Sequence, residues 1–267
     1  MDDFRETVLL MLVWIIGHFL AVAIGMTLGL IGGGGSMLAI PVLIYVMGLD
    51  AKEAIAMSFV MVGIVSLIGL IPHWLQGNVN FKAAIIFTPP AMLGAFLGAR
   101  LALLPLITDT IQLIAFAIMM LVASVSMIWG QLNQLHKLPH SPKNHRLTMM
   151  LEGLGVGTIT GFVGIGGGFV IIPALVLFGG IPMKEAIGTS LLIIAFKSVT
   201  GFAGYLDRVV LNFNLIVSFT LAAGVGIVIG AYLTKLIEAK QLKKGFGYFV
   251  LAIAVSILTQ HLIFDLG

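Results

Sequence analysis

A single lysine, Lys197, lies near the centre of a long apolar segment, residues 187–206. A lysine at the centre of a membrane-spanning helix costs about 2.5 kcal/mol or more unless it is paired or solvated. No Asp or Glu lies in the middle of any apolar segment, so an internal carboxylate partner is not expected. The ammonium could instead be paired with a bound anion, or be solvated by backbone carbonyls or hydroxyls. Alternatively, the amine could be neutral. We interpret Lys197 as a candidate anion-binding residue, with a snorkelling or structural lysine as the alternative.

Hydroxyl groups accompany this lysine. Thr189 and Ser190 open the segment, and Ser58 occupies the position equivalent to Ser190 in the first half of the chain. Such groups donate hydrogen bonds to oxyanion oxygens without adding charge. The alternative is a bond to the carbonyl of the preceding helical turn, which is common for Ser and Thr in membranes. As binding residues we favour Ser58 and Ser190 over a second equivalent pair, Ser66 and Ser198.

Two glycine-rich runs interrupt the apolar sequence at the same spacing, 132 residues apart. The first holds Gly25, Gly29, Gly32, Gly34 and Gly35, and the second holds Gly157, Gly161, Gly164, Gly166 and Gly167. Each run leads into a short apolar segment that contains Ile-Pro, at Ile40-Pro41 and Ile172-Pro173. Paired helix breaks within a duplicated sequence are typical of transporters that bind their substrate between two repeats.

The breaks have a chemical consequence, because a bilayer does not tolerate unsatisfied backbone groups unless protein or a cavity encloses them. The short segments that follow begin at about Ser36 and Gly168, with their positive dipole ends at the breaks. Two such ends meeting near the midplane favour an oxyanion. The candidate binding residues at the breaks are Gly34, Gly35, Ser36, Gly166, Gly167 and Gly168. For the pairs Gly25/Gly29 and Gly157/Gly161 we favour tight helix packing instead.

The composition places the chain in a membrane. Apolar residues make up 60% and charged residues 9%, and the mean hydropathy is +1.15. A soluble domain has about a quarter charged residues. The alternating pattern of barrel strands is not found, so we expect an all-α polytopic protein. There are no cysteines, which excludes disulfides and thiol chemistry. The acidic amino terminus does not resemble a removable signal peptide.

Polar residues, glycines and prolines interrupt the apolar sequence and divide each half of the chain into five apolar segments. They are 7–31, 36–48, 55–72, 83–104 and 111–130, then 149–166, 168–179, 187–206, 213–234 and 246–264. The short segments, at about 12 residues each, reach about 18 Å and cannot cross a hydrocarbon core of about 30 Å. We read them as half-helices. The domains are therefore repeat one (1–130), a cytoplasmic linker (131–148) and repeat two (149–267).

Positive charges predict the orientation, because Lys and Arg concentrate in cytoplasmic loops. The linker holds Lys137, Lys143 and Arg146, and a second group of lysines, from Lys235 to Lys244, precedes the last segment. The linker follows the fifth segment of repeat one, whereas the second group precedes the fifth segment of repeat two. Equivalent segments then run in opposite directions, so the repeats are inverted and both termini are non-cytoplasmic. Parallel tandem copies, the alternative, would place one lysine-rich loop outside.

At these residues the chain resembles the sulfite exporter TauE/SafE family, also called TSUP. The resemblance rests on the Gly-rich breaks, the Glu-Ala-Ile-x-x-Ser stretches (Glu53 to Ser58 and Glu185 to Ser190), Gly77 to Phe81, and Gly94 to Arg100. It spans nearly the whole chain. It implies an inner-membrane transporter of small sulfur-containing anions or organosulfonates. Met57 stands where the family often has threonine.

We therefore expect a secondary transporter, not an enzyme, that moves a sulfite-like oxyanion by alternating access. The partners are a small anion and the bilayer, not nucleic acid; a homodimer is left open. We expect no catalytic residue, cofactor or metal. One alternative is a carrier of another small anion or a neutral or cationic solute, although a positive centre without carboxylates disfavours cations. Others are an intramembrane serine hydrolase with Ser36 and His18, and a structural subunit.

Overall fold

The computed structural model describes residues 2–129, 145–164, 168–177, 179–206, 209, 211–233 and 239–264. Every secondary-structure element in these ranges is a helix, which confirms the all-α prediction. The long helices are α1 (Asp2–Ile31), α3 (Ala51–Leu75), α4 (Phe81–Ala102), α5 (Asp109–Trp129), α6 (His145–Val163), α8 (Met183–Tyr205), α9 (Phe213–Leu233) and α10 (Ala239–Phe264). Most of the predicted linker lies outside the described residues, and its last four residues belong to α6.

Five of these helices are long and apolar enough to cross a membrane, so the chain is a multi-pass membrane protein. The candidate spans are Met11–Ile31, Ala51–Leu75, Phe81–Ala102, Lys184–Tyr205 and Phe213–Leu233. Shorter apolar stretches lie in α5, at Asp109–Val122, and in α10, at Val250–Thr259. The outward faces of the helices carry large apolar side chains; Phe19 is 78% and Ile85 71% exposed. Such faces suit contact with lipid chains.

The two short segments lie where the sequence predicts them, but they differ in regularity. The first consists of a 3₁₀ helix η1 (Gly33–Leu38), one α turn α2 (Ala39–Pro41) and a π turn η2 (Val42–Val46). The second is a regular helix, α7 (Gly168–Leu177). Neither is long enough to cross a bilayer alone. The predicted half-helices are confirmed in length, and the first is not a continuous α-helix.

Glycine is required at both breaks by the backbone angles. Gly32, directly after α1, has φ +72°, and Gly164, directly after α6, has φ +80°. Side chains disfavour this left-handed region, in which glycine is at ease. The chain therefore turns at equivalent positions of the two glycine runs. These two residues, Gly32 and Gly164, lie two positions before Gly34 and Gly166.

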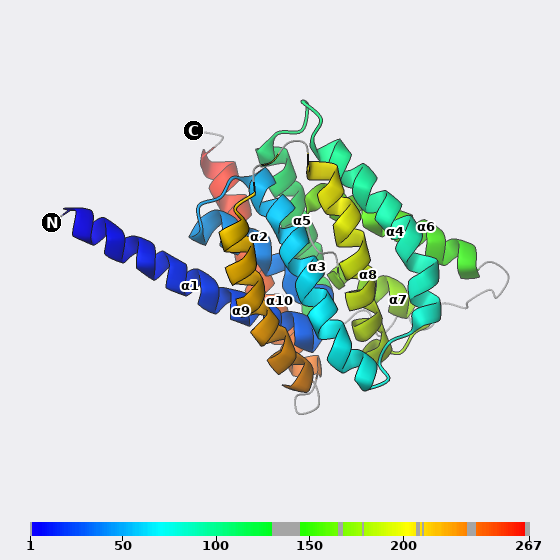
Figure 1. Ribbon diagram of the computed structural model, residues 1–267. Helices are drawn as coiled ribbons and strands as arrows, with labels where there is room; N and C mark the ends of the chain where they lie inside the picture. The colour runs from blue at the N-terminus through cyan, green and yellow to red at the C-terminus, as the bar shows by residue number, and fades with distance from the viewer. Residues whose placement is uncertain are drawn as a thin grey trace.

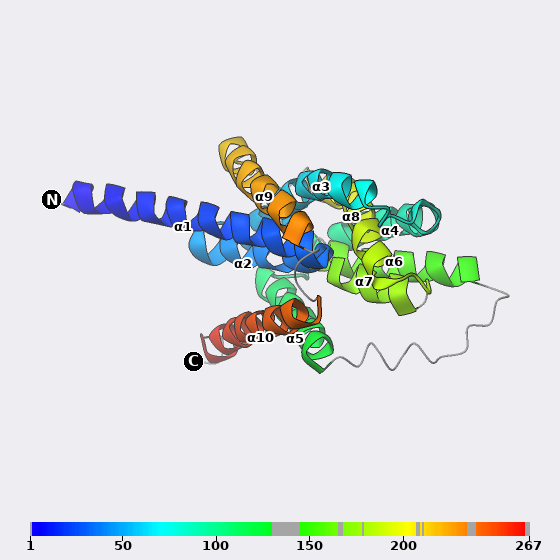
Figure 2. The same cartoon turned by 90° about the horizontal axis from the view of Figure 1, so that it is seen from below.

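The helices pack in a row whose order is α6, α4, α8, α3, α9 and α1. Figures 1 and 2 show this row, with α5 and α10 packed against each other to one side of it. The contacts come in matched sets: α4 packs against α6 and α8, and α9, the equivalent of α4, packs against α1 and α3. Each outer contact joins a helix from the first half of the chain to one from the second half.

Glycines bring the outer helices of the row into close contact. A Cβ atom at Gly157 of α6 would collide with the carbonyl oxygen of Ala91 on α4, and one at Gly161 with that of Ala95. The equivalent glycines of α1 make the same contacts with α9, Gly25 at Ala223 and Gly29 at Ile227. The packing role predicted for these two glycine pairs is confirmed.

The central helices α3 and α8 run in opposite directions. Phe59 of α3 lies against Gly201, near the end of α8, and His73, near the end of α3, lies against Gly188, near the start of α8. Figure 1 shows α3 descending from its blue end while α8 rises towards its yellow end. Between these contacts, a Cβ atom at Gly63 would lie 3.0 Å from the Cβ of Ser198. We call this place, where the two helices meet at Gly63 and Ser198, the central crossing.

Candidate functional site

Lys197 points into the protein from the middle of α8. Its side chain is 0% exposed, whereas its neighbours Phe196 and Val199 are 49% and 64% exposed on the outer face of the helix. The ammonium donates a hydrogen bond to Oγ1 of Thr160 over 2.5 Å. Among the residues that the structure describes, no carboxylate pairs with Lys197. The full burial of the side chain disfavours the snorkelling alternative, whereas the anion-binding and structural interpretations of Lys197 both stay predictions.

Thr160 is a residue of this site that the sequence analysis missed. It lies in the last turn of α6, four residues before the break at Gly164. Its own hydroxyl hydrogen is directed to the carbonyl oxygens of Val156, at 2.7 Å, and Gly157, at 3.2 Å. The Thr160 oxygen therefore acts as an acceptor towards the ammonium. A threonine one turn before a predicted break is the sequence signal that would have identified it.

The corresponding place in the first half of the chain carries no charge. The residues equivalent to Lys197 and Thr160 are Val65 and Leu28, which are 1% and 0% exposed. An apolar pair therefore occupies the position that an ammonium and a hydroxyl occupy in the second half. Within the ranges that the structure describes, a lysine and hydroxyl pair therefore lies at the second break and not at the first.

Each break is enclosed by a helix from the other half of the chain. Gly164 lies against Ile55 of α3, and Ser58 donates to its carbonyl oxygen over 3.1 Å. At the equivalent place, a Cβ atom on Gly32 would lie 3.0 Å from Oγ of Ser190 on α8. Gly32 and Gly164 are both buried. The expectation that the broken backbone is enclosed by protein therefore holds at both turns.

The serines at the breaks use their hydroxyl hydrogens on the local backbone. Ser36 donates to the carbonyl of Gly33, Ser58 to that of Ile55 and Ser190 to that of Ile187, each over 2.7 Å. This is the back-bonding alternative set out above for Ser58 and Ser190. The Ser58 hydrogen is shared between the Ile55 carbonyl and the more distant one of Gly164. In this conformation the three hydroxyls have no hydrogen left for an anion, since each carries only one.

The remaining predicted site residues are placed as follows. Gly35 lies in η1 and folds back onto α1, where a Cβ atom would lie 2.5 Å from Oγ1 of Thr27. Gly34 is also part of η1, and Gly168 is the first residue of α7. Gly166 and Gly167 lie outside the described residues.

Thr189 holds a loop. Its Oγ1 accepts a hydrogen bond of 2.8 Å from the backbone N–H of Asn80, in the connection between α3 and α4. The Asn80 amide also donates to Glu185 over 3.3 Å. Thr189 lies about two turns from Lys197 along α8. This hydrogen bond fastens the α3–α4 connection to α8, and the sequence did not reveal it.

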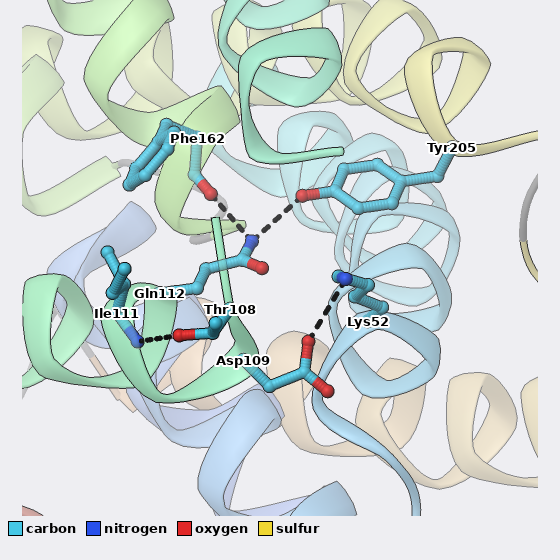
Figure 3. Close-up of polar contacts among 7 residues, drawn as sticks. All are labelled: Lys52, Thr108, Asp109, Ile111, Gln112, Phe162 and Tyr205. Carbon is cyan, nitrogen blue, oxygen red and sulfur yellow. Dashed lines mark hydrogen bonds and ion pairs between the residues drawn. The ribbon is translucent and has the colours of Figure 1, made fainter. Parts of the chain in front are cut away.

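A second polar cluster secures the end of α6 (Figure 3). Gln112 of α5 donates to the carbonyl oxygen of Phe162 at 2.7 Å and to the hydroxyl of Tyr205 at 2.9 Å. Nearby, Lys52 and Asp109 form an ion pair of 3.2 Å at the starts of α3 and α5. Phe162 lies two residues before the break at Gly164, so this cluster fixes the carbonyl end of α6.

His73, the residue equivalent to Tyr205, fixes the end of α1. Its Nε2–H donates to the carbonyl of Gly29 over 3.1 Å, and the side chain is 2% exposed. Nδ1 has no partner within the described residues. The sequence analysis missed both His73 and Gln112, because each lies near the end of an apolar segment, where a polar residue is ordinary.

Ser36 and His18 do not form a nucleophile and base. The Ser36 hydroxyl donates to Gly33, as above, and Nδ1 of His18 donates to the carbonyl of Trp14 at 2.7 Å. Hydrogen-bond reach between the two side chains is what a serine hydrolase needs. No such contact joins these two described residues.

Comparison with known proteins identifies the kind of chain in which this arrangement occurs. The family model described as "Sulfite exporter TauE/SafE" matches residues 18–257. A "Probable membrane transporter protein" of Xylella fastidiosa is 32% identical over 240 residues, which is 88% of this chain and 91% of that protein. The "Probable membrane transporter protein YdhB" of Bacillus subtilis is 26% identical over 222 residues, 82% of this chain and 90% of that protein. No solved structure matches the chain.

Proposed function

Since the chain belongs to the sulfite exporter TauE/SafE family, whose named relatives are membrane transporters and not enzymes, we propose that it is a secondary carrier for a small sulfur-containing oxyanion or organosulfonate. The carrier operates in the inner membrane by alternating access. The substrate is the small anion that the sequence predicts as partner, and the bilayer is the solvent. A homodimer stays a prediction.

One observation carries the choice of an anion, which is the fully buried ammonium of Lys197. A buried cation without a counter-charge is strongly disfavoured, so such groups pair with another charge or with a ligand. Thr160 supplies a neutral oxygen only. A negative solute entering near the second break would supply the missing charge. A cationic solute would meet repulsion there, and a neutral one would leave the ammonium uncompensated.

The helix directions support two inverted repeats. Equivalent helices α3 and α8 are antiparallel. Helix α4 runs parallel to α8, because Met92 and Ala99 meet Thr200 and Gly204 in the same order along the chain. Helix α9 runs parallel to α3, because Ile68 and Gly69 meet Gly224 and Ile227 in the same order. Inverted repeats that exchange conformations give alternating access around a fixed site. In this proposal the two breaks, each enclosed by the other repeat, are the parts that move with the substrate.

Transport in proteoliposomes tests the proposal. Wild-type protein is expected to move sulfite or a related anion from a panel of thiosulfate, sulfate, sulfoacetate and chloride, with a flux that responds to membrane potential as a negative charge requires. Lys197→Met should abolish this flux, because it removes the charge and keeps most of the side-chain volume. Lys184→Met, at an exposed lysine on the same helix, is the matched control. Flux through Lys197→Met at the wild-type level would remove Lys197 from the site.

A further inference from the structure

Two buried serine hydroxyls flank the central crossing without a hydrogen-bond partner. Ser66 on α3 is 0% exposed and Ser198 on α8 is 2% exposed, and neither Oγ has a partner among the described residues. They occupy equivalent positions in the two halves of the chain. Buried polar groups are nearly always hydrogen-bonded in native proteins, so unpaired ones call for an explanation.

Other buried serines behave differently. Ser58 and Ser190, on the same two helices, each close a 2.7 Å bond to a carbonyl in the preceding turn. Ser124, buried in α5, does the same over 2.8 Å with Leu121. Ser66 and Ser198 are thus the pair on α3 and α8 whose hydrogens are not spent on the helix backbone.

Lys197 is the chain neighbour of Ser198 and lies at the same depth. Its ammonium carries three N–H groups, and Thr160 takes one of them. The hydroxyls of Ser66 and Ser198 and two N–H groups of Lys197 are therefore hydrogen-bond donors without an acceptor among the described residues, and the lysine adds one positive charge. A ligand that satisfies all of them must be negative and must offer several acceptor oxygens.

We propose that Ser66 and Ser198, together with Lys197, donate to the oxygen atoms of the transported oxyanion. This inference rests on the proposed function and names the residues that recognise the substrate. It moves the direct contacts away from the serines of the glycine runs, to the place where the two halves of the protein meet. Lys197 supplies the charge, and the paired hydroxyls supply selectivity for oxygen-bearing anions.

The close approach at the central crossing sets a condition on binding. A Cβ atom at Gly63 would lie 3.0 Å from the Cβ of Ser198, so α3 and α8 touch at this level. An anion can bridge Ser66 and Ser198 only when the two helices separate. Binding at this place therefore couples the substrate to relative movement of α3 and α8, as alternating access requires.

The test compares anions on purified full-length protein by isothermal titration, using sulfite, sulfate and bromide. In the double variant Ser66→Ala/Ser198→Ala, sulfite affinity should fall by about 10-fold or more, because a hydrogen bond to a charged group is among the stronger ones. Bromide affinity should change little, since a halide relies on the charge of Lys197. The control Ser124→Ala removes a back-bonded buried hydroxyl and should bind both anions like the wild type.

The outcomes separate the inference from the function on which it rests. Wild-type sulfite affinity in the double variant, alongside lost binding in Lys197→Met, would overturn the role of the two serines and leave the carrier intact. A wild-type protein that binds none of the anions would overturn the proposed function. If the double alanine variant does not fold, Ser66→Cys/Ser198→Cys, which keeps the shape with a weaker donor, gives the same comparison. Equal loss of sulfite and bromide binding in that variant would also count against the serines.

Discussion

The hydroxyl of Ser58 on α3 donates to the carbonyl of Gly164 at the end of α6 over 3.1 Å, across 106 residues of sequence. The equivalent pair, Gly32 and Ser190, is also in contact. Each break therefore rests on a central helix that belongs to the other half of the chain. A displacement of α3 relative to α8 must shift both breaks, because each helix holds one of them.

Gly164→Ala should disrupt the second break. The residue has φ +80°, and its added Cβ would collide with the side chain of Ile55. Left-handed backbone costs a side chain about 1–2 kcal/mol, and overpacking typically adds about 1–3 kcal/mol. Gly48→Ala is the control, because Gly48 has φ +73° and open space around it. Thermal unfolding in detergent should rank wild type, Gly48→Ala and Gly164→Ala in decreasing order. Equal loss in the two variants would show that contact with Ile55 is unimportant.

Gly157→Ala should destabilise the protein and Gly155→Ala should not, although both glycines lie on α6. Alanine at 157 meets the backbone of Ala91 on α4, whereas nothing lies within 4 Å of a Cβ at 155. The first change should destabilise the protein by about 1–3 kcal/mol as α6 and α4 are forced apart. The second should be neutral or stabilise it by up to about 1 kcal/mol through helix propensity. Melting temperatures that fall together would contradict the assigned packing face of α6.

Thr160→Val should weaken anion binding even though the side chain keeps its shape. Valine cannot accept from the ammonium of Lys197, which then loses its hydrogen bond to residue 160. Leaving a buried donor unpaired costs about 1–3 kcal/mol. Thr160→Ser keeps the acceptor and should retain binding. Titration calorimetry on both variants makes the comparison. If Thr160→Ser binds as poorly as Thr160→Val, then the methyl group and not the oxygen matters.

Lys52→Cys and Lys184→Cys should be labelled from opposite sides of the membrane. The two lysines are equivalent in sequence and begin the antiparallel helices α3 and α8. The chain has no cysteine, so each variant carries a single reactive thiol. Following the chain from the two lysine-rich loops, which are expected to be cytoplasmic, puts Lys52 outside and Lys184 inside. An impermeant maleimide added to intact spheroplasts should therefore modify position 52 and reach position 184 only after lysis. Labelling of both from one side would favour parallel copies.

The sequence was informative where a feature is local or repeated. The glycine runs predicted the turns at Gly32 and Gly164, because few other residues adopt a positive φ. Apolar segment lengths predicted the long helices and the two short ones. The glycine spacing on α1 and α6 predicted close helix contacts, since small residues at that spacing lie on one helix face.

Contacts between distant segments were not predictable in the same way. Thr160, Gln112 and His73 became visible only when the helix order placed them opposite Lys197, Phe162 and Gly29. Several side chains on one face of a helix could contact the adjacent helix, and the angle and position at which the two helices pack determine which of them does. Hydroxyl orientation is a further degree of freedom, so the difference between the back-bonded Ser190 and the unpaired Ser198 has no signature in the sequence.

The interleaved order of the row bears on how such a protein can be assembled. Helix α1 packs through its glycines against α9, and α6 packs through its glycines against α4. If the chain were cut in the linker, each half would lack the helices of the other half against which its own helices pack. We therefore expect that neither fragment folds by itself. During synthesis α1 is made long before α9, so its packing contact with α9 can form only after α9 has also entered the bilayer. The order in which the helices insert therefore differs from the order in which they pack. A lone ancestral half would for the same reason have needed a second copy of itself.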